Sequence, residues 1–367
     1  MNKKDSILSV CVLLPLSKIY GFGVGLRNKF FDWGILRSVK FDIPIVVVGN
    51  LAIGGTGKTP HTEYLIRLLS EDYKVGVVSR GYKRKTQGFV LASNTSTPND
   101  IGDEPYQMHK KFYGRIKVAV CEKRVVGVRR LLKLFPEINL IILDDAFQHR
   151  YLEPSYSLVL TEYNRPVYDD DLLPLGQLRE GRLGLNRANV VIATKCPEEI
   201  STLDLRLVKN GLNLFPHQHL FFSKYKYGKL LSVFPDYTSY LPSLEWMTEE
   251  DGILAVTGIA NPKHFTRYLK TYNAKVKAIV FADHHDFTRK DLEFMKSTVN
   301  KMEGKRRIII TTEKDAVRMA SNPYFPEDLK PYVFYLPINV EFIHSGDRTF
   351  DSIIKSDISK ISNNFSK

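Results

Sequence analysis

The stretch VVVGNLAIGGTGKTPHTEYLIRLL, residues 46–69, decides the fold of this chain. It starts with β-branched residues, passes through a glycine-rich turn that ends in Lys58 and Thr59, and continues with apolar residues at helical spacing. A strand, a glycine-rich turn and a helix in this order are typical of a phosphate-binding loop, or P-loop. The match is imperfect, because the usual pattern has a glycine where this chain has Ala52.

The residue types in this loop suit phosphate binding. Gly54, Gly55 and Gly57 let backbone N–H groups approach phosphate oxygens closely. Lys58 can reach the terminal phosphates, and the Thr59 hydroxyl can bind Mg²⁺. The helix that follows directs its positive N-terminus at the same anion. The alternative is a purely structural strand-to-helix turn with an exposed lysine.

The composition fits a cytoplasmic protein with an anionic partner. The 367 residues are enough for two compact domains, and 43% of them are hydrophobic, so a large core can form. Lys and Arg outnumber Asp and Glu by 53 to 40, which favours nucleic acid, an acidic membrane surface or a phosphorylated substrate as partner. The three cysteines are far apart in sequence, which argues against a disulfide framework or a zinc site.

The first 36 residues predict a helical segment associated with a membrane surface. Lys3 and Lys4 precede the apolar run ILSVCVLLPL, residues 7–16. We reject a signal peptide because a nucleotide-binding loop belongs where ATP is, and a full span because the run is short and contains Pro15. The alternative is an N-terminal helix packed on the protein's own core. We expect instead a pair of helices in the membrane interface, with four aromatic anchors: Phe22, Phe30, Phe31 and Trp33.

Strands and helices alternate after this segment, which predicts an α/β fold with helices on both faces of a parallel sheet. Residues 37–217 are expected to form this core, a parallel-sheet domain like those of the P-loop NTPases. Its strands are predicted at residues 45–48, 75–79, 116–120, 140–143, 158–160 and 190–193.

A smaller second α/β domain is expected over residues 246–345. Between the two domains, residues 218–245 alternate aromatic and polar side chains around Gly228 and predict a β-ribbon followed by a linker. Residues 346–367 are expected to form a C-terminal tail, frayed from residue 355 onward. The second domain is predicted to have strands at 253–257, 276–281, 307–311 and 332–335 and helices at 263–271, 289–299 and 315–319.

Asp144 and Asp145 form a candidate metal site. They end the apolar run NLIILDD, the form of a strand that delivers a carboxylate beside a phosphate loop to hold Mg²⁺. The alternative is a plain turn with two acids. A later strand ends in Thr194-Lys195, where guanine-binding proteins of this architecture carry a base-reading motif, but Pro197 occupies the position of its aspartate. ATP is therefore favoured over GTP.

Asp103 and His284 are candidates for a cleft between the two domains. Asp103 lies in GDEP at the start of a predicted helix, and His284 lies in FADHHDF after a strand of the second domain. Strand exits of α/β domains are where such clefts form. The alternatives are that Asp103 caps its helix and that His284 and His285 are ordinary loop histidines.

Eight short motifs occur in the order found in a family of kinases. They are GNLAIGGTGKTP, SRGY, GDEP, DDAFQH, LPLGQLRE, TGIANPKHF, FADHHDF and TTEKDA. On these motifs the chain resembles tetraacyldisaccharide 4′-kinase, the lipid A kinase of Gram-negative bacteria, up to about residue 340. The resemblance implies transfer of the γ-phosphate of ATP, with Mg²⁺, to the 4′-hydroxyl of a tetraacylated glucosamine disaccharide 1-phosphate, which forms lipid IVA. It also implies a peripheral or monotopic enzyme at the cytoplasmic face of the inner membrane.

The resemblance further implies roles for residues in or near family motifs. The catalytic residues would be Asp103 as base for the sugar hydroxyl, His284 to orient or tune it, and Lys58. The triphosphate would be held by Gly54, Gly55, Thr56, Gly57, Lys58 and Thr59. Mg²⁺ would be bound by Thr59 with Asp144 or Asp145. Contacts to nucleotide, phosphate or substrate are expected from Tyr82, Arg124, Arg179 and Glu180.

A second hypothesis is a P-loop switch ATPase of the partitioning or metal-delivery type, in which hydrolysis switches a dimer. Such proteins usually carry a second lysine near the start of the loop, whereas this chain has no lysine between Lys40 and Lys58. No helicase-like motif set or RNA-binding motif is present, so no nucleic-acid partner is expected. The sequence indicates no obligate protein partner.

Overall fold

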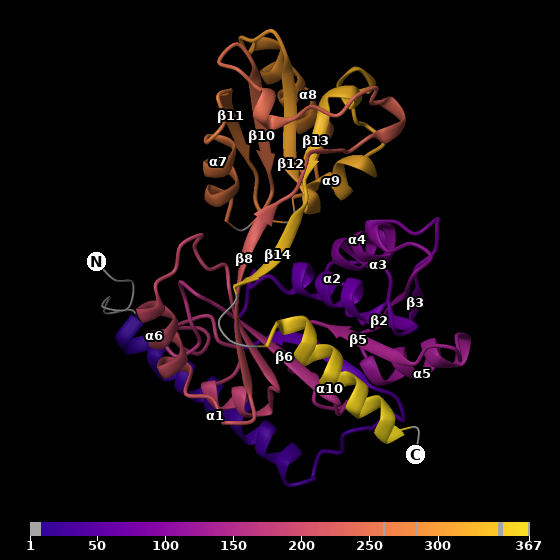
Figure 1. The fold of residues 1–367 in the computed structure, drawn as a ribbon, viewed down its shortest axis with the longest axis vertical. Coiled ribbons are helices and arrows are strands. Elements are labelled where there is room, and N and C mark those ends of the chain that lie inside the picture. The colour runs from indigo at the N-terminus through magenta and orange to yellow at the C-terminus, as the bar shows by residue number, and fades with distance from the viewer. Residues whose placement is uncertain (1–8, 260, 284, 344–347, 366–367) are drawn as a thin grey trace.

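The computed structural model of the chain describes residues 9–259, 261–283, 285–343 and 348–365. It contains two α/β units, each built on its own sheet and placed one above the other along the long axis (Figure 1). In the order of the larger sheet, the strands are β14 (Ile338–Ile343), β8 (His219–Tyr227), β7 (Val190–Thr194), β6 (Tyr156–Glu162), β1 (Ile45–Asn50), β5 (Leu140–Asp144), β2 (Val75–Ser79), β4 (Lys117–Val120) and β3 (Val90–Leu91).

The six strands predicted for the core are confirmed as β1, β2, β4, β5, β6 and β7. They pair in parallel with one another, and nearly all of their residues are buried, as expected for a sheet covered on both faces. The helices of this unit are α2 (Lys58–Leu69), α3 (Pro98–Ile101), α4 (Asp103–Lys111), α5 (Arg124–Leu134), α6 (Thr202–Leu212) and α10 (Phe350–Phe365).

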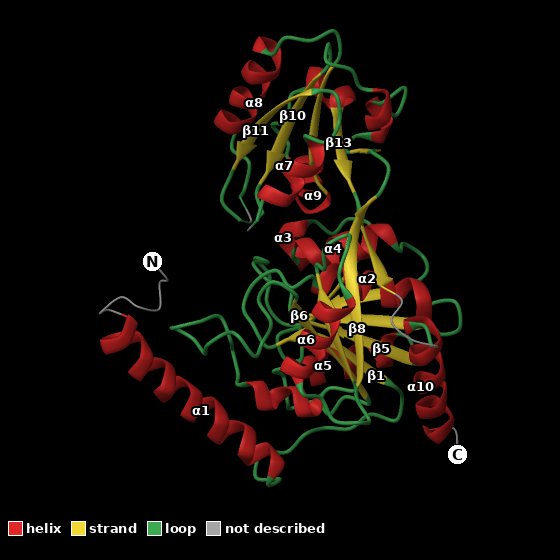
Figure 2. Cartoon of the chain, turned by 60° about the vertical axis from the view of Figure 1, so that its left-hand side comes forward, coloured by secondary structure: helices red, strands yellow, loops and turns green. Residues whose placement is uncertain are grey.

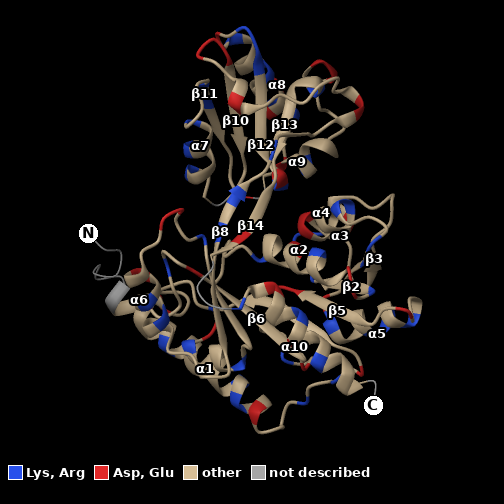
Figure 3. Cartoon of the chain, in the orientation of Figure 1, with Lys and Arg blue, Asp and Glu red and all other residues tan. Residues whose placement is uncertain are grey.

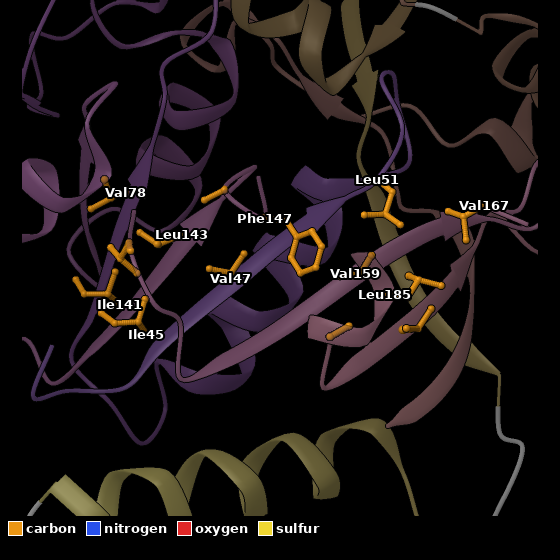
Figure 4. Packing of buried hydrophobic residues seen from close by; sticks show 14 of the residues in the cluster. Ile45, Val47, Leu51, Val78, Ile141, Leu143, Phe147, Val159, Val167 and Leu185 are labelled. Atoms are coloured by element: carbon orange, nitrogen blue, oxygen red, sulfur yellow. The ribbon is translucent and has the colours of Figure 1, made fainter. Parts of the chain in front are cut away.

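Helices cover both faces of the larger sheet. On one face, Val47 of β1 belongs to a buried cluster with Val128 of α5 and Val208 of α6; Figure 4 shows the strand residues of this cluster side by side. On the other face, Val46 belongs to a cluster with residues of α2, α4 and α10. Successive residues of β1 therefore face opposite layers, which explains its uninterrupted apolar sequence.

The prediction of a frayed C-terminal tail from residue 355 onward is wrong as far as Phe365. Residues 350–365 form α10, which lies along the larger sheet (Figure 1) and buries Phe350, Ile354 and Ile358 in the cluster with α2 and α4. The sequence reads as polar because apolar residues occupy one face of this helix only. The helix is stabilised by this amphipathic spacing, which the average polarity of the segment does not reveal.

The second unit has its own sheet and core. Its helices pack Phe265, Met295 and Met319 against the strands. The four strands and three helices predicted here are all present, with small differences at their ends. In sheet order the strands are β11 (Lys275–Val280), β10 (Gly252–Thr257), β12 (Arg307–Thr312), β13 (Val333–Leu336) and β9 (Leu231–Ser232), and the helices are α7 (Lys263–Leu269), α8 (Arg289–Lys301) and α9 (Glu313–Ala320).

Two extended strands connect the units. β8 runs up from the larger sheet and β14 returns to it, and they pair antiparallel from Tyr227–Ile338 to Phe222–Ile343 (Figure 1). The ribbon expected around Gly228 is therefore not a local hairpin. Its partner strand lies more than a hundred residues away, so the pairing could not be read from the local alternation.

The N-terminal segment is one continuous helical stretch. A short π-helix (Ser9–Leu13) leads into α1 (Leu14–Asp32), which lies at the side of the larger unit (Figure 2). The predicted pair of helices is wrong for the described residues, and the predicted anchor Phe31 is buried against Tyr151. Phe22 and Trp33 are 74% and 62% exposed. Over the residues that the structure describes, no helix is long and apolar enough to cross a membrane.

Candidate active site

The P-loop joins β1 to α2 in the predicted strand, turn and helix order. Gly54 and Gly57 have φ of +105° and +92°, a left-handed conformation that glycine adopts readily. A Cβ at Gly57 would lie 1.9 Å from the hydroxyl oxygen of Tyr225 on β8. Glycine at this position therefore meets both a backbone and a packing requirement.

Lys58 begins α2 beside a group of polar side chains. Its ammonium lies 3.4 Å from Asn50 Oδ1 and 3.7 Å from Asp145 Oδ1. Arg179 reaches the same two oxygens, at 2.6 and 3.1 Å, and its Nε donates to the carbonyl oxygen of Ala52 at 3.1 Å. Two cations are thus held beside the phosphate loop by protein acceptors, ready to neutralise an anion placed there.

The pairing of β1 with β5 delivers Asp144 to the loop. In this register Val48 of β1 is the partner of Asp144, which ends β5. Asp144 is almost fully buried, and its oxygens accept hydrogen bonds from Thr62 at 3.0 Å and Ser79 at 3.4 Å. The acid at the end of the apolar run is therefore aimed at the P-loop helix, as the sequence predicted.

Asp144 and Asp145 ionise in different surroundings. Burial, followed by the negative charges of Glu104 and Asp145, raises the pKa of Asp144 to about 7. Burial also acts to raise the pKa of Asp145, but Lys58 and Arg179 together outweigh it and lower that pKa. The two neighbouring carboxyl groups therefore have pKa values that are shifted in opposite directions.

The oxygen donors at this edge of the sheet suit Mg²⁺. Thr59 follows Lys58 in the first turn of α2 and carries a hydroxyl. Within the described ranges, no group of three or more His, Cys, Asp and Glu could hold a metal by itself. In nucleotide sites Mg²⁺ uses one or two carboxylates, with phosphate oxygens and water completing its shell. A Mg²⁺ ion at this edge of the sheet would therefore depend on the nucleotide for part of its coordination shell.

Arg124 supports the backbone of Asp145. The side chain is nearly fully buried, and its Nη2 donates to the carbonyl oxygen of Asp145 at 3.3 Å. Asp145 has φ of +46°, a conformation that non-glycine residues adopt at a cost and that surrounding contacts must hold. Arg124 thus lies behind the paired aspartates and fixes their geometry.

Glu180 links the site to α1. Its carboxylate is 2% exposed and accepts hydrogen bonds from Asn28 on α1, Gln148 and Arg187, at 3.0, 3.1 and 2.5 Å. The preceding residue is Arg179, which touches the P-loop. The described contacts of Glu180 are thus with protein groups, and they tie the N-terminal helix to the phosphate-binding region.

Asp103 does not cap its helix. The N-cap of α4 is Gly102, and Asp103 is the first helical residue, held by Arg318 of α9 in the second unit. Tyr82, 60% exposed, belongs to the same region, because a Cβ on Gly102 would lie 2.9 Å from its carbonyl oxygen. The structure therefore places Asp103 where the two units meet, with the backbone of Tyr82 beside the preceding Gly102.

His284 lies outside the described residues. The neighbouring His285 is stacked on Phe281, 4.5 Å between ring centroids, and its Nε2 lies 2.9 Å from Asp291 Oδ2. The carbonyl oxygen of His285 accepts a hydrogen bond from Arg318 at 2.8 Å. Arg318, which was not predicted as a site residue, thus holds the backbone of His285 close to Asp103.

Three residues of the site were not predicted from the sequence. Asn50 accepts from both cations, Gln148 bonds Glu180 and the carbonyl oxygen of Asn50, and Arg318 binds Asp103. Each lies in or beside a quoted motif, and this position is the feature of the sequence that could have indicated them as site residues. Their side chains act across the fold, which spacing along the chain cannot reveal.

The comparisons with known proteins agree with this arrangement. The family model described as "Tetraacyldisaccharide-1-P 4'-kinase" matches residues 9–359. The chain belongs to the tetraacyldisaccharide-1-P 4′-kinase family. The motif-based resemblance is thereby confirmed, and family membership decides against the switch ATPase.

Relatives in this family match nearly end to end. The tetraacyldisaccharide 4′-kinase of Phocaeicola vulgatus is 48% identical over 354 residues, covering 96% of each chain. That of Bacteroides thetaiotaomicron is 48% identical over 349 residues, covering 93% of this chain and 91% of its own. The crystal structure of LpxK from Aquifex aeolicus in complex with ATP has a TM-score of 0.71 at 27% identity, covering 95% of this chain and 98% of that one. The predicted α/β kinase fold is thereby confirmed.

Proposed function

We propose that the protein transfers the γ-phosphate of ATP to the 4′-hydroxyl of a tetraacylated glucosamine disaccharide 1-phosphate. The observation that carries this proposal is the family match over residues 9–359 together with a P-loop flanked by Lys58, Arg179 and the paired aspartates. Relatives that match end to end are named for this reaction, and the Aquifex relative was crystallised with ATP. The product would be lipid IVA, an intermediate of lipid A biosynthesis.

The P-loop residues would bind the triphosphate. Backbone N–H groups of residues 54–59 would surround its β- and γ-phosphates, and Lys58 would contact the oxygens that gain charge during transfer. Arg179, which contacts the same Asn50 oxygen as Lys58, would add a second cation for these phosphates. Thr59 with Asp144 or Asp145 would hold Mg²⁺, whose charge offsets that of the phosphates when it is bound.

Asp103 would act on the acceptor. A sugar hydroxyl is a poor nucleophile at neutral pH, so a carboxylate must accept its proton as the phosphoryl group moves. Asp103 is an acid at the contact between the larger unit and the second unit, and His284 would orient or tune it. The larger unit would supply the nucleotide site and the second unit, from β10 to β13, the other wall of the cleft, with β8 and β14 connecting them.

The exposed face of α1 would lie on the cytoplasmic side of the inner membrane. Ile19 and Phe22 are 69% and 74% exposed, a costly arrangement in water for two large apolar side chains. Lys and Arg recur along α1 (Figure 3), and Lys29 stands one turn before the exposed Trp33. Apolar burial and attraction to anionic head groups would act together at such a surface.

The decisive experiment is a kinase assay with purified protein. ATP consumption is measured with and without an acylated disaccharide 1-phosphate in detergent micelles, and the lipid product is analysed for a new phosphate at the 4′ position. We expect turnover only when both substrates are present. ATP hydrolysis that ignores the lipid would contradict the proposal.

A further inference from the structure

Arg318 joins the candidate base to the second unit. Its Nε and Nη2 donate to Asp103 Oδ2 at 3.0 and 2.5 Å, and its Nη1 donates to the carbonyl oxygen of His285 at 2.8 Å. The side chains of Arg318 and Asp103 are only 8% and 11% exposed. One guanidinium thus fixes the distance between Asp103 and the FADHHDF segment, with the fork geometry that arginine supplies and lysine does not.

A second ion pair sets the register of the same contact. Helices α4 and α9 lie against each other where the two units meet (Figures 1 and 2), and Lys111 at the end of α4 is 2.8 Å from Glu313 at the start of α9. At the opposite ends, Asp103 starts α4 and Arg318 lies in the last turn of α9. The charges are reversed between the two pairs, so a shifted contact would bring like charges together.

We propose that Arg318 is a positioning residue of the kinase reaction, which keeps Asp103 ionised and aimed at the acceptor while α9 contacts α4. The inference rests on the proposed function, in which Asp103 is the base. A buried carboxylate without a cation favours its neutral form, which cannot accept a proton. Arg318 removes that penalty and at the same time holds the carboxylate in one orientation.

The other charged groups that the structure shows around Asp103 and Arg318 are either exposed to water or in contact with other residues. Asp286 lies 3.9 Å from Arg318 Nη1, but its side chain is 98% exposed and water screens it. Asp315 on α9 is buried and accepts from the backbone of Gly258 and the hydroxyl of Thr312. The remaining charged neighbours on the two helices are Glu104 on α4, which acts on Asp144, and Lys314 on α9, which lies 3.4 Å from Asp283. Arg318 donates directly to the Asp103 carboxylate, so we expect its removal to disfavour the ionised form of Asp103.

The test compares two variants of this arginine over a pH series. Arg318→Met removes the charge, and Arg318→Lys keeps it but loses the fork. With ATP and the acylated disaccharide 1-phosphate saturating, we expect Arg318→Met to lower kcat by about 10²-fold, the scale of general-base catalysis. The acid limb of its pH–rate profile should move to higher pH by about one unit, because the carboxylate loses its cation. Arg318→Lys should lose about tenfold in kcat with the acid limb unmoved.

Glu313→Gln is the matched control, since it removes the other ion pair of the α4–α9 contact and leaves Asp103 and Arg318 intact. Its acid limb should coincide with that of the wild type. Binding of a fluorescent ATP analogue without acceptor checks that each variant is folded, and Arg318→Gln replaces Arg318→Met if the latter does not bind it.

Three results would overturn the inference: an unmoved acid limb in the neutral variant, an equal shift in Glu313→Gln, or the same shift in Arg318→Lys. Failure of the proposed function would look different, because the wild type itself would then show no lipid-dependent use of ATP.

Discussion

Glu63, on the helix that follows the P-loop, lies 2.6 Å from the ammonium of Lys111, and yet its carboxyl group resists ionisation. Burial is the largest cause, the charge of Glu313 adds to it, and Lys111 opposes both, which leaves the pKa of Glu63 raised to about 7. Lys111 also lies 2.8 Å from Glu313, so one cation serves two carboxylates. The folded protein therefore binds a proton at Glu63 more tightly than the unfolded chain does.

This difference makes stability depend on pH. Between the ordinary value of 4.5 and about 7, the unfolded chain has lost the proton that the folded protein still holds, so the free energy of unfolding falls as pH rises. Glu63→Gln removes this contribution, and the urea midpoint of the variant should vary less with pH between about 5 and 8. Glu293→Gln, at an exposed position on α8, is the control and should retain the wild-type slope. Equal slopes in both variants would contradict the assignment.

Lys58→Met tests the nucleotide site. Lys58 would stabilise charge on the transferring phosphoryl group, so its loss should lower kcat by about 10² to 10³-fold with the fold intact. The measurement is kcat at saturating ATP, with the thermal unfolding midpoint as the check on folding. Lys305→Met, whose side chain is 76% exposed in the second unit, is the matched control. Wild-type activity in a folded Lys58→Met protein would exclude the P-loop as the phosphate site.

Sequence patterns predicted those parts of this fold that depend on neighbouring residues. The strand, turn and helix around Lys58, the strand that ends in Asp144, and the alternation of the second unit all follow from periodicity over 5 to 15 residues. The motif set then identified the family. These features could be predicted because local spacing and residue type cause them directly.

Features that depend on residues far apart in the chain could not be predicted from the sequence. The pairing of β8 with β14 joins strands more than a hundred residues apart, and α10 is ordered by the sheet that it covers. In the same way, nothing near Asp103 in the sequence indicates that Arg318, 215 residues later, holds its carboxylate. Tertiary contacts of this kind override the local preference for a cap or a frayed end.

Variants on the two sides of α1 separate its membrane role from its contact with the site. Ile19→Ser with Phe22→Ser changes exposed residues only and should move the protein from vesicles of anionic lipid into solution, with ATP use in detergent unchanged. Asn28→Ala removes a hydrogen bond to buried Glu180 and should raise KM for ATP by up to about tenfold, because a charged acceptor loses one of its donors.

The two measurements are vesicle flotation and steady-state kinetics in detergent. Flotation of Asn28→Ala should match the wild type. If the serine variant still floated in high salt, the membrane contact would have to lie elsewhere. If Asn28→Ala had a wild-type KM for ATP, the hydrogen bond from α1 to Glu180 would have no effect on the nucleotide site.

Asp103 and His284 are predicted to act as one unit. If His284 works by orienting or tuning Asp103, then losing either residue removes the same general-base contribution, typically about 10² to 10⁴ in rate. The losses from Asp103→Ala and His284→Ala should then be strongly non-additive, and the double variant should be little worse than the poorer single variant. The measurement is kcat for all three variants at saturating ATP over a pH series, with His285→Ala as a neighbouring control whose ring faces Asp291. Losses that multiply, with an unchanged pH profile in His284→Ala, would show that His284 does not act through Asp103 and would leave Arg318 as the residue of the second unit that controls the base.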